Sequence, residues 1–141
     1  MNKSGKGFMK LITGILLMTL FSLLSPGDVV GQDINTKISQ AIKASNSSEL
    51  SKYFNNSIDL TIPGSEGTYS KVQAEQIIRS FFVKYPPVSF TINHKGNSND
   101  GSIYAIGTYN SSTQSFRTYY LAKPIEKQLL IHQLKFELKE D

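Results

Sequence analysis

The sequence predicts an α+β fold in which helices pack on one face of a mostly antiparallel sheet. The clearest helix signal lies between Tyr69 and Pro87, where apolar residues recur at intervals of three and four positions. After Pro87 the period of the apolar residues changes from 3.6 to 2, which is typical of strands. Shorter patterns of both kinds precede the main helix signal, so helices and strands are expected to share one domain.

Residues 1–31 have the three-part layout of a secretory signal peptide. A lysine-rich opening is followed by an apolar run from Leu11 to Leu24, and small residues then lead to Gly31. We expect cleavage between Gly31 and Gln32 and export to the periplasm or the medium. The alternative is an uncleaved membrane anchor, but the run is shorter than the roughly 20 residues that a span needs. The product would be a single domain of residues 32–141 without stable insertion in the membrane.

The composition excludes several classes of site. The chain has no cysteine, which removes disulfides, thiol chemistry and cysteine–metal sites. The net charge of +4 falls to about +2 without the leader, and no run of Lys and Arg remains, so no nucleic-acid partner is expected. The only histidines are His94 and His132. Two histidines without cysteine do not suggest a zinc site, and we expect no metal and no cofactor.

Two helices are expected before the first strand. The first runs from Asp33 to Ala44, with its apolar residues on one face and polar residues on the other. The second is short and begins after Asn46, which has a capping-box pattern with Glu49. The apolar face of the first helix consists of Ile34, Ile38, Ala41 and Ile42.

The main helix begins after Ser70, which with Gln73 three positions later has the pattern of a capping box. Pro86-Pro87 ends it, because proline cannot continue a helix. Its apolar stripe needs a broad apolar surface, which the later strands are expected to supply. The stripe consists of Ala74, Ile77, Ile78, Phe81, Phe82 and Tyr85.

The strands are bounded by turn signals. A first strand is expected from Ser57 to Ile62, where apolar and polar residues alternate. Pro63-Gly64 suits the centre of a type II turn, and residues 65–68 are expected to be a loop or a very short strand. Further strands are expected over residues 88–94, 102–110, 113–122 and 128–138, with a plain loop at 95–101.

Alternation along these strands assigns side chains to two faces, if Asn110 pairs with Thr113 and Gly96 with Gly101. The more apolar inner face is expected to receive the main helix. Its members are Phe90, Ile92, His94, Ala105, Gly107, Tyr109, Phe116, Thr118, Tyr120, Leu129, Ile131 and, by the same parity, Gln133. The outer face carries Tyr104, Ile106, Arg117, Tyr119, Leu130, His132 and Leu134. This outer face is too apolar to remain in water and is typical of an interface.

The segment Gly67-Thr68-Tyr69-Ser70-Lys71-Val72-Gln73-Ala74 and its continuation to Phe82 resemble the helix-entry segment of NTF2-like (nuclear-transport-factor-2-like) domains. Residues 105–109 and 129–134 resemble their later strands. The resemblance covers nearly all of residues 32–141 and is similar in detail to a group of small exported bacterial domains of unknown function. It implies a cystatin-like cone in which a curved, mostly antiparallel sheet wraps around one long and two shorter helices.

The resemblance also directs attention to the inside of the cone, where enzymes of the superfamily move protons with an acid–base pair. The candidate ligand-binding residues are His94, Tyr109, Thr118 and Tyr120. A histidine beside a phenol supplies acid–base groups, but the only nearby strand acid, Asp59, is expected to point outward. We therefore assign no catalytic residue. A small isomerase-like or dehydratase-like enzyme that acts on a hydrophobic molecule is the alternative.

The leading expectation is an exported, non-catalytic binding or assembly domain that forms a homodimer through its convex sheet face. The candidate interface residues are Tyr104, Ile106, Arg117, Tyr119 and His132. Arg117 suits either an anionic or stacked partner or the shielding of apolar sheet surface. A small hydrophobic ligand or an envelope protein are the other candidate partners. We expect aromatic rings of the main helix to fill the cone, which would leave the outer face as the working surface.

Overall fold

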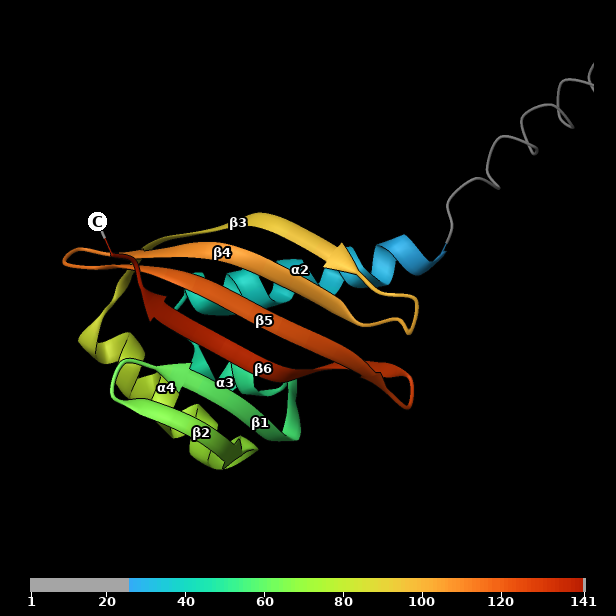
Figure 1. Ribbon diagram of the computed structural model, residues 1–141, viewed down its shortest axis with the longest axis horizontal. Helices are drawn as coiled ribbons and strands as arrows, with labels where there is room; N and C mark the ends of the chain where they lie inside the picture. Colours follow the sequence, from blue (N-terminus) through green and yellow to red (C-terminus); the bar gives the residue numbers. More distant parts are fainter. Residues whose placement is uncertain (1–25, 141) are drawn as a thin grey trace, which may run out of the picture. The chain divides into compact units, whose positions relative to one another are not determined.

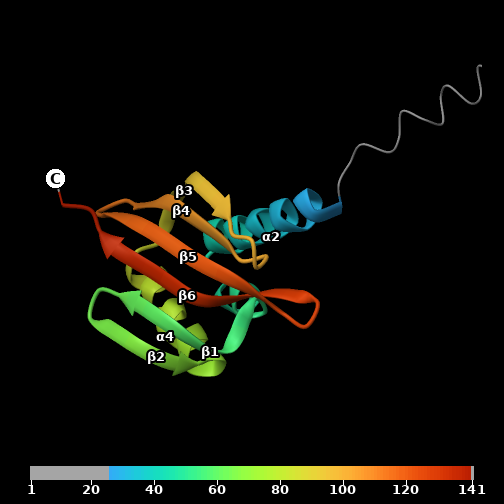
Figure 2. The same ribbon diagram turned by 45° about the vertical axis from the view of Figure 1, so that its right-hand side comes forward.

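The computed structural model describes residues 26–140, and its centre is a six-stranded sheet in the order β2-β1-β6-β5-β4-β3. Neighbouring strands are antiparallel except β1 and β6, which are parallel. In Figure 1 the helices lie behind the sheet, on one of its faces, and Figure 2 shows the same layering from a second direction. The strands are β1 (Phe54–Ile62), β2 (Ser65–Ser70), β3 (Pro87–Asn97), β4 (Ile103–Ser111), β5 (Ser115–Ile125) and β6 (Gln128–Leu138).

The described part of the chain contains helices α2 (Pro26–Lys43), α3 (Ser47–Ser51) and α4 (Lys71–Lys84). Helix α2 begins seven residues before the expected Asp33, at a proline, which is favoured in the first turn because its missing N–H has no helical partner there. With 18 residues, α2 is longer than the 14-residue α4, so the expected main helix is not the longest. No helix among residues 26–140 is long and apolar enough to cross a membrane.

The leader expected at residues 1–31 lies mostly outside the described residues. Residues 32–141 form one compact unit. The expected cleavage point between Gly31 and Gln32 falls within α2. The expected turn at Pro63-Gly64 is present, and Gly64 has the positive φ of 85° that a glycine adopts without steric cost. Residues 65–68 belong to a true strand, β2, which pairs with β1.

Both long helices bury the faces that the sequence predicts. Ser70 caps α4, since its hydroxyl accepts from the Gln73 backbone while the Gln73 side chain accepts from the Ser70 backbone. At the start of α3, the Asn46 side chain accepts from the Glu49 backbone at 2.9 Å. The buried apolar residues of α2 within residues 34–43 are Ile34, Ile38, Ala41 and Ile42, and those of α4 are Ala74, Ile78, Phe81 and Phe82.

Aromatic rings fill the space between α4 and the sheet. The Phe81 ring lies at the centre of this cluster, with its centroid 4.7 Å from that of Phe136 and 5.1 Å from that of Phe116. Phe82 stacks on Tyr109 at 6.2 Å. Each of these five rings is at most 3% exposed. The space between α4 and the sheet is therefore a packed core. The cluster consists of these five rings and the partly buried Tyr85.

The face assignment is right where the strands are regular. Asn110 pairs with Ser115 and not with Thr113, but a change of two residues preserves the alternation. Tyr109 and Phe116 therefore face the core together, as expected. Phe90 also covers Gly107: a methyl group built there would lie 3.0 Å from the Phe90 ring.

The assignment is wrong beyond two β-bulges. In β3 the register changes between Ile92 and His94, so His94 pairs with Ile106 and lies on the outer face. The expected loop at 95–101 also begins later, because β3 continues to Asn97.

In β6 the register changes around His132, so Gln133 turns outward and Leu134 turns inward, where Leu134 is fully buried. Each bulge adds one residue to one strand, and that residue reverses every later side chain.

Candidate functional site

The two interior phenols are bonded and closed to solvent. The Tyr109 hydroxyl donates to the backbone carbonyl of Tyr85, and the Tyr120 hydroxyl donates to Asn35 Oδ1 at 2.5 Å. Tyr109 and Tyr120 are at most 1% exposed. Burial raises the pKa of both phenols well above the ordinary value, so both hydroxyls remain protonated donors. The Tyr109 hydroxyl therefore holds the C-terminal end of α4 to the sheet, and the Tyr120 hydroxyl holds α2 to the sheet.

Thr118, the third interior candidate, is fully buried, and its Oγ1 has no hydrogen-bond partner among the described residues. An unpaired buried hydroxyl has lost its bonds to water without replacing them. We expect Thr118→Val to raise the free energy of unfolding by about 1 kcal/mol, because valine keeps the branched shape without the hydroxyl. Urea denaturation measures this.

Thr118→Ser is the matched control, because it keeps the hydroxyl and removes the methyl group, and it should destabilise the fold by about 1 kcal/mol. A Thr118→Val protein less stable than the parent would contradict the assignment of an unpaired hydroxyl.

His94, the fourth candidate, lies on the other side of the sheet. Its Nε2 is 3.0 Å from the hydroxyl oxygen of Tyr104, whose ring lies over Gly96. The expectation that His94 shares a face with Tyr109 and Tyr120 is therefore wrong, for the reason given by the bulge in β3. The structure brings the two phenols and Thr118 into one core, but none of residues 26–140 brings a titratable base to them.

The outer face carries a central group of half-buried side chains, the outer-face cluster: Tyr104, Ile106, Tyr119 and Leu121. Cross-strand pairing places Tyr104 opposite Leu121 and Ile106 opposite Tyr119. Leu121, which was not named among the expected outer residues, belongs to the cluster and pairs with Gln133. Leu134, which was expected on this face, is turned into the core by the bulge in β6. Three of the expected outer residues, Tyr104, Ile106 and Tyr119, thus share a surface with one new member.

The cluster is bordered by charged and polar groups. The exposed Arg117 lies in β5, with its Nη1 3.9 Å from Glu137 Oε2. His132, at the bulge, is half-buried, and its Nδ1 is 2.9 Å from the Leu130 carbonyl. Asp59 is exposed, as expected for its position, and accepts from the Thr68 hydroxyl at 2.6 Å. No described group of three or more His, Asp or Glu side chains is arranged to hold a metal.

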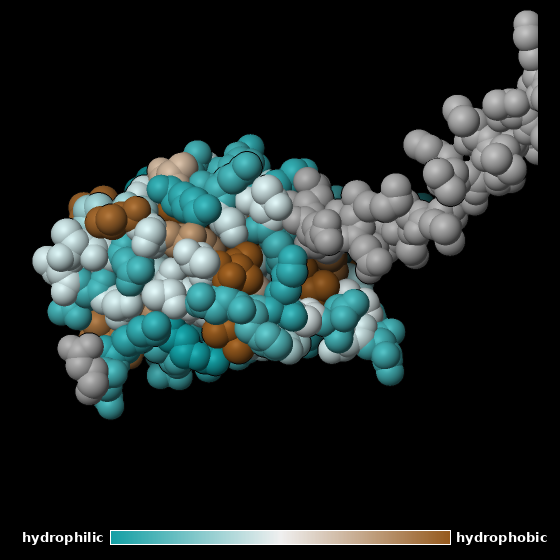
Figure 3. All heavy atoms as spheres, turned by 90° about the horizontal axis from the view of Figure 1, so that it is seen from above, coloured by the Kyte–Doolittle hydropathy of each residue, from teal (hydrophilic) through white to brown (hydrophobic). Residues whose placement is uncertain are grey.

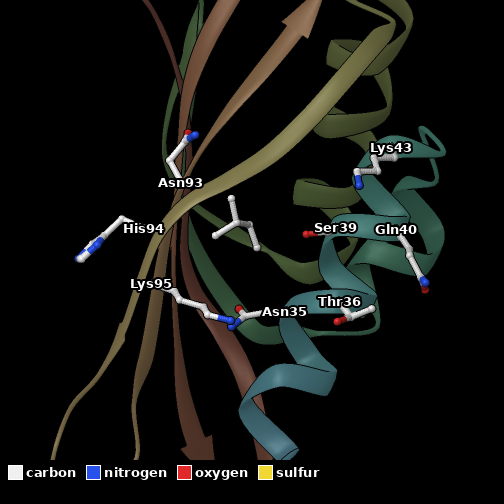
Figure 4. A pocket seen from close by; sticks show the side chains of 9 residues that line it. Asn35, Thr36, Ser39, Gln40, Lys43, Asn93, His94 and Lys95 are labelled. Carbon is white, nitrogen blue, oxygen red and sulfur yellow. The ribbon is translucent and has the colours of Figure 1, made fainter.

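A cleft with a volume of about 730 Å³ separates α2 from the edge strand β3. Figure 4 shows Ser39 and Lys95 pointing into it from opposite sides, while His94 points away. Seen from the β3 edge, the surrounding surface is mainly hydrophilic with a few separate hydrophobic groups (Figure 3). The cleft is lined by Asn35, Thr36, Ser39, Gln40, Lys43, Ile92, Asn93, His94 and Lys95.

The sequence did not predict this cleft. Its two walls, residues 35–43 and 92–95, are far apart in the chain, and each reads as an ordinary polar surface. Their meeting depends on which strand lies at the edge beside α2, and no local pattern carries that information.

The six-stranded mixed sheet with helices on one face defines a domain of the NTF2-like class, as the resemblance implied. A candidate dehydratase of the NTF2-like family from Streptomyces avermitilis has the same fold, with a TM-score of 0.62 over 83% of this chain and all of that chain, at 13% identity. The chain belongs to the DUF4783 family, a domain of unknown function, whose family model matches residues 35–137.

Two crystal structures of DUF4783 proteins are similar to this chain. The protein from Bacteroides ovatus is 30% identical, with a TM-score of 0.70 over 74% of this chain and 94% of its own. The protein from Bacteroides uniformis is 27% identical, with a TM-score of 0.71 over 75% of this chain and 97% of its own. No curated protein matches the sequence.

Proposed function

We propose that this DUF4783 domain is a non-catalytic binding or assembly domain that works as a homodimer through its outer sheet face. The observation that carries the proposal is the outer-face cluster, because Tyr104, Ile106, Tyr119 and Leu121 form contiguous cross-strand pairs away from the core. Half-buried aromatic and aliphatic side chains at the middle of a sheet face are characteristic of the core of an interface.

The charges around the cluster favour a second copy of the chain as the partner. Arg117 and Lys135 contribute positive charge, and Glu137, Asp59 and Glu66 contribute negative charge on the same face. A two-fold dimer brings the same patch of each protomer together. A face that carries both signs at its rim can therefore be complementary to itself, whereas a partner of a single sign would meet like charges.

The packed interior supports a non-catalytic role. The phenols are bonded to Tyr85 and Asn35, and the histidine lies on the opposite face. Proton transfer needs an acid or base within hydrogen-bond reach of the substrate. The rings around Tyr109 pack on one another, and no described acid or base lies within hydrogen-bond reach of the Tyr109 or Tyr120 hydroxyl.

Ile106→Glu tests the dimer. A glutamate at the centre of the cluster would bury an unpaired charge on association, which costs several kcal/mol. Sedimentation of the parent protein at tens of micromolar should show a dimer, and Ile106→Glu should raise the dissociation constant about 100-fold or more.

Val83→Glu is the matched control, since Val83 lies on α4 and is 76% exposed. It adds the same charge away from the sheet face and should leave the dimer intact. A parent protein that sediments as a monomer, or equal effects of the two glutamates, would contradict the proposal.

We also propose that the domain is exported. The basic opening and the apolar run from Leu11 to Leu24 support this, as does a family match that begins only at residue 35. Mass spectrometry of the protein recovered from the cell envelope or the medium should give a mature N-terminus at Gln32. A full-length chain in the cytoplasm would refute it.

A further inference from the structure

We infer that the cleft between α2 and β3 is a binding site for a small organic carboxylate with a short apolar chain. The inference is independent of the dimer, because the cleft opens at the β3 edge of the sheet and shares none of the outer-face cluster.

Asn35 supplies the first argument. Its side-chain oxygen accepts from the Tyr120 hydroxyl at 2.5 Å, which fixes the orientation of the amide. The amide nitrogen carries two N–H donors, and no described group accepts a hydrogen bond from it. These donors are therefore available to a ligand in the cleft, which Asn35 lines. Asn35 is only 8% exposed, so this is a buried, oriented donor and not a freely rotating surface amide. A buried donor favours a ligand that accepts.

Lys95 and Lys43 supply the second argument. Lys95 comes from β3 and points toward Asn35 across the cleft, and Lys43 lies on the last turn of α2 (Figure 4). Neither ammonium group has an ion-pair partner among the described residues, and the described lining contains no carboxylate. The Lys95 charge and the Asn35 donors thus favour a negative group between them. Lys43, eight residues from Asn35 along α2, adds to the positive potential of the cleft.

Ile92 narrows the class of ligand. It lines the cleft, pairs with Gly107 on the inner face and packs against the core. Its apolar surface lies beside the donors, together with the Ser39 hydroxyl on α2. A carboxylate with a short hydrocarbon chain satisfies both kinds of surface, while an inorganic anion uses only the polar one.

The test is a titration of the full chain with hexanoate, followed by the side-chain amide resonances of Asn35 and by calorimetry. Hexanoate should bind saturably and shift the Asn35 amide signals. Hexanamide, which lacks the charge, and acetate, which lacks the chain, should each bind about tenfold more weakly. Inorganic phosphate that binds as tightly as hexanoate would overturn the carboxylate class.

Lys95→Gln should weaken hexanoate binding about tenfold, and Lys127→Gln is the control, because Lys127 is an exposed lysine in the turn between β5 and β6. Asn35→Asp keeps the acceptor for Tyr120 but replaces the donors with a negative charge, and it should abolish binding. Since Lys95 is exposed, its variant should keep the thermal stability of the parent. Equal effects of Lys95→Gln and Lys127→Gln would overturn the inference.

Discussion

Replacement of Phe81 by alanine is expected to lower the free energy of unfolding by about 3–5 kcal/mol. The Phe81 ring lies within 5.4 Å, centroid to centroid, of the rings of Tyr85, Tyr109, Phe116 and Phe136. Its removal would leave a cavity bounded by the sheet, which cannot collapse because its strands are hydrogen-bonded to one another. Calorimetry should show a fall in Tm of about 15 °C or more.

Val83→Ala is the matched control, two residues away on the same helix. Val83 is 76% exposed, so its truncation should change the free energy of unfolding by less than about 0.5 kcal/mol. If Phe81→Ala cost no more than this control, the aromatic cluster would not be the core that holds α4 to the sheet.

The helices and the core could be predicted from the sequence because their signals are local. The stripe of α4 and its capping residues lie within one continuous segment, and the structure buries the predicted residues Ala74, Ile78, Phe81 and Phe82. The start of α2 was less accurate, because Pro26 ends an apolar run and also suits the first turn of a helix. The sequence pattern supports both interpretations.

The faces of the strands could be predicted only up to each bulge. In β6 the apolar residues change parity between Ile131 and Leu134, so the pattern did carry a sign of the extra residue. In β3 no apolar residue follows Ile92 within the strand, so nothing local marks the bulge at Asn93. For this reason His94 was predicted on the inner face, whereas it lies on the outer face. The alternative of an acid–base enzyme therefore lacks a histidine base inside the cone.

Gly107→Ala is expected to destabilise the fold by about 1–3 kcal/mol. A methyl group on Gly107 would lie 2.7 Å from the backbone oxygen of Thr91 in the neighbouring strand and 3.0 Å from the Phe90 ring. A backbone oxygen cannot rotate away, so β3 would have to move from β4, and the Phe90 ring would have to shift slightly within the core. Equilibrium unfolding in guanidinium chloride measures the loss.

Gly96→Ala separates this effect from the general consequences of replacing a glycine in β3 or β4. A methyl group there would lie 2.6 Å from Tyr104, but the contact is with the end of a side chain on the outer face, which can turn aside. Both variants restrict the unfolded chain to the same extent, so their difference reports the contact alone. Gly96→Ala should cost less than about 1 kcal/mol and should disturb the contact between Tyr104 and His94. If the two variants were equally destabilised, the close approach of β3 to Gly107 would not be what requires a glycine.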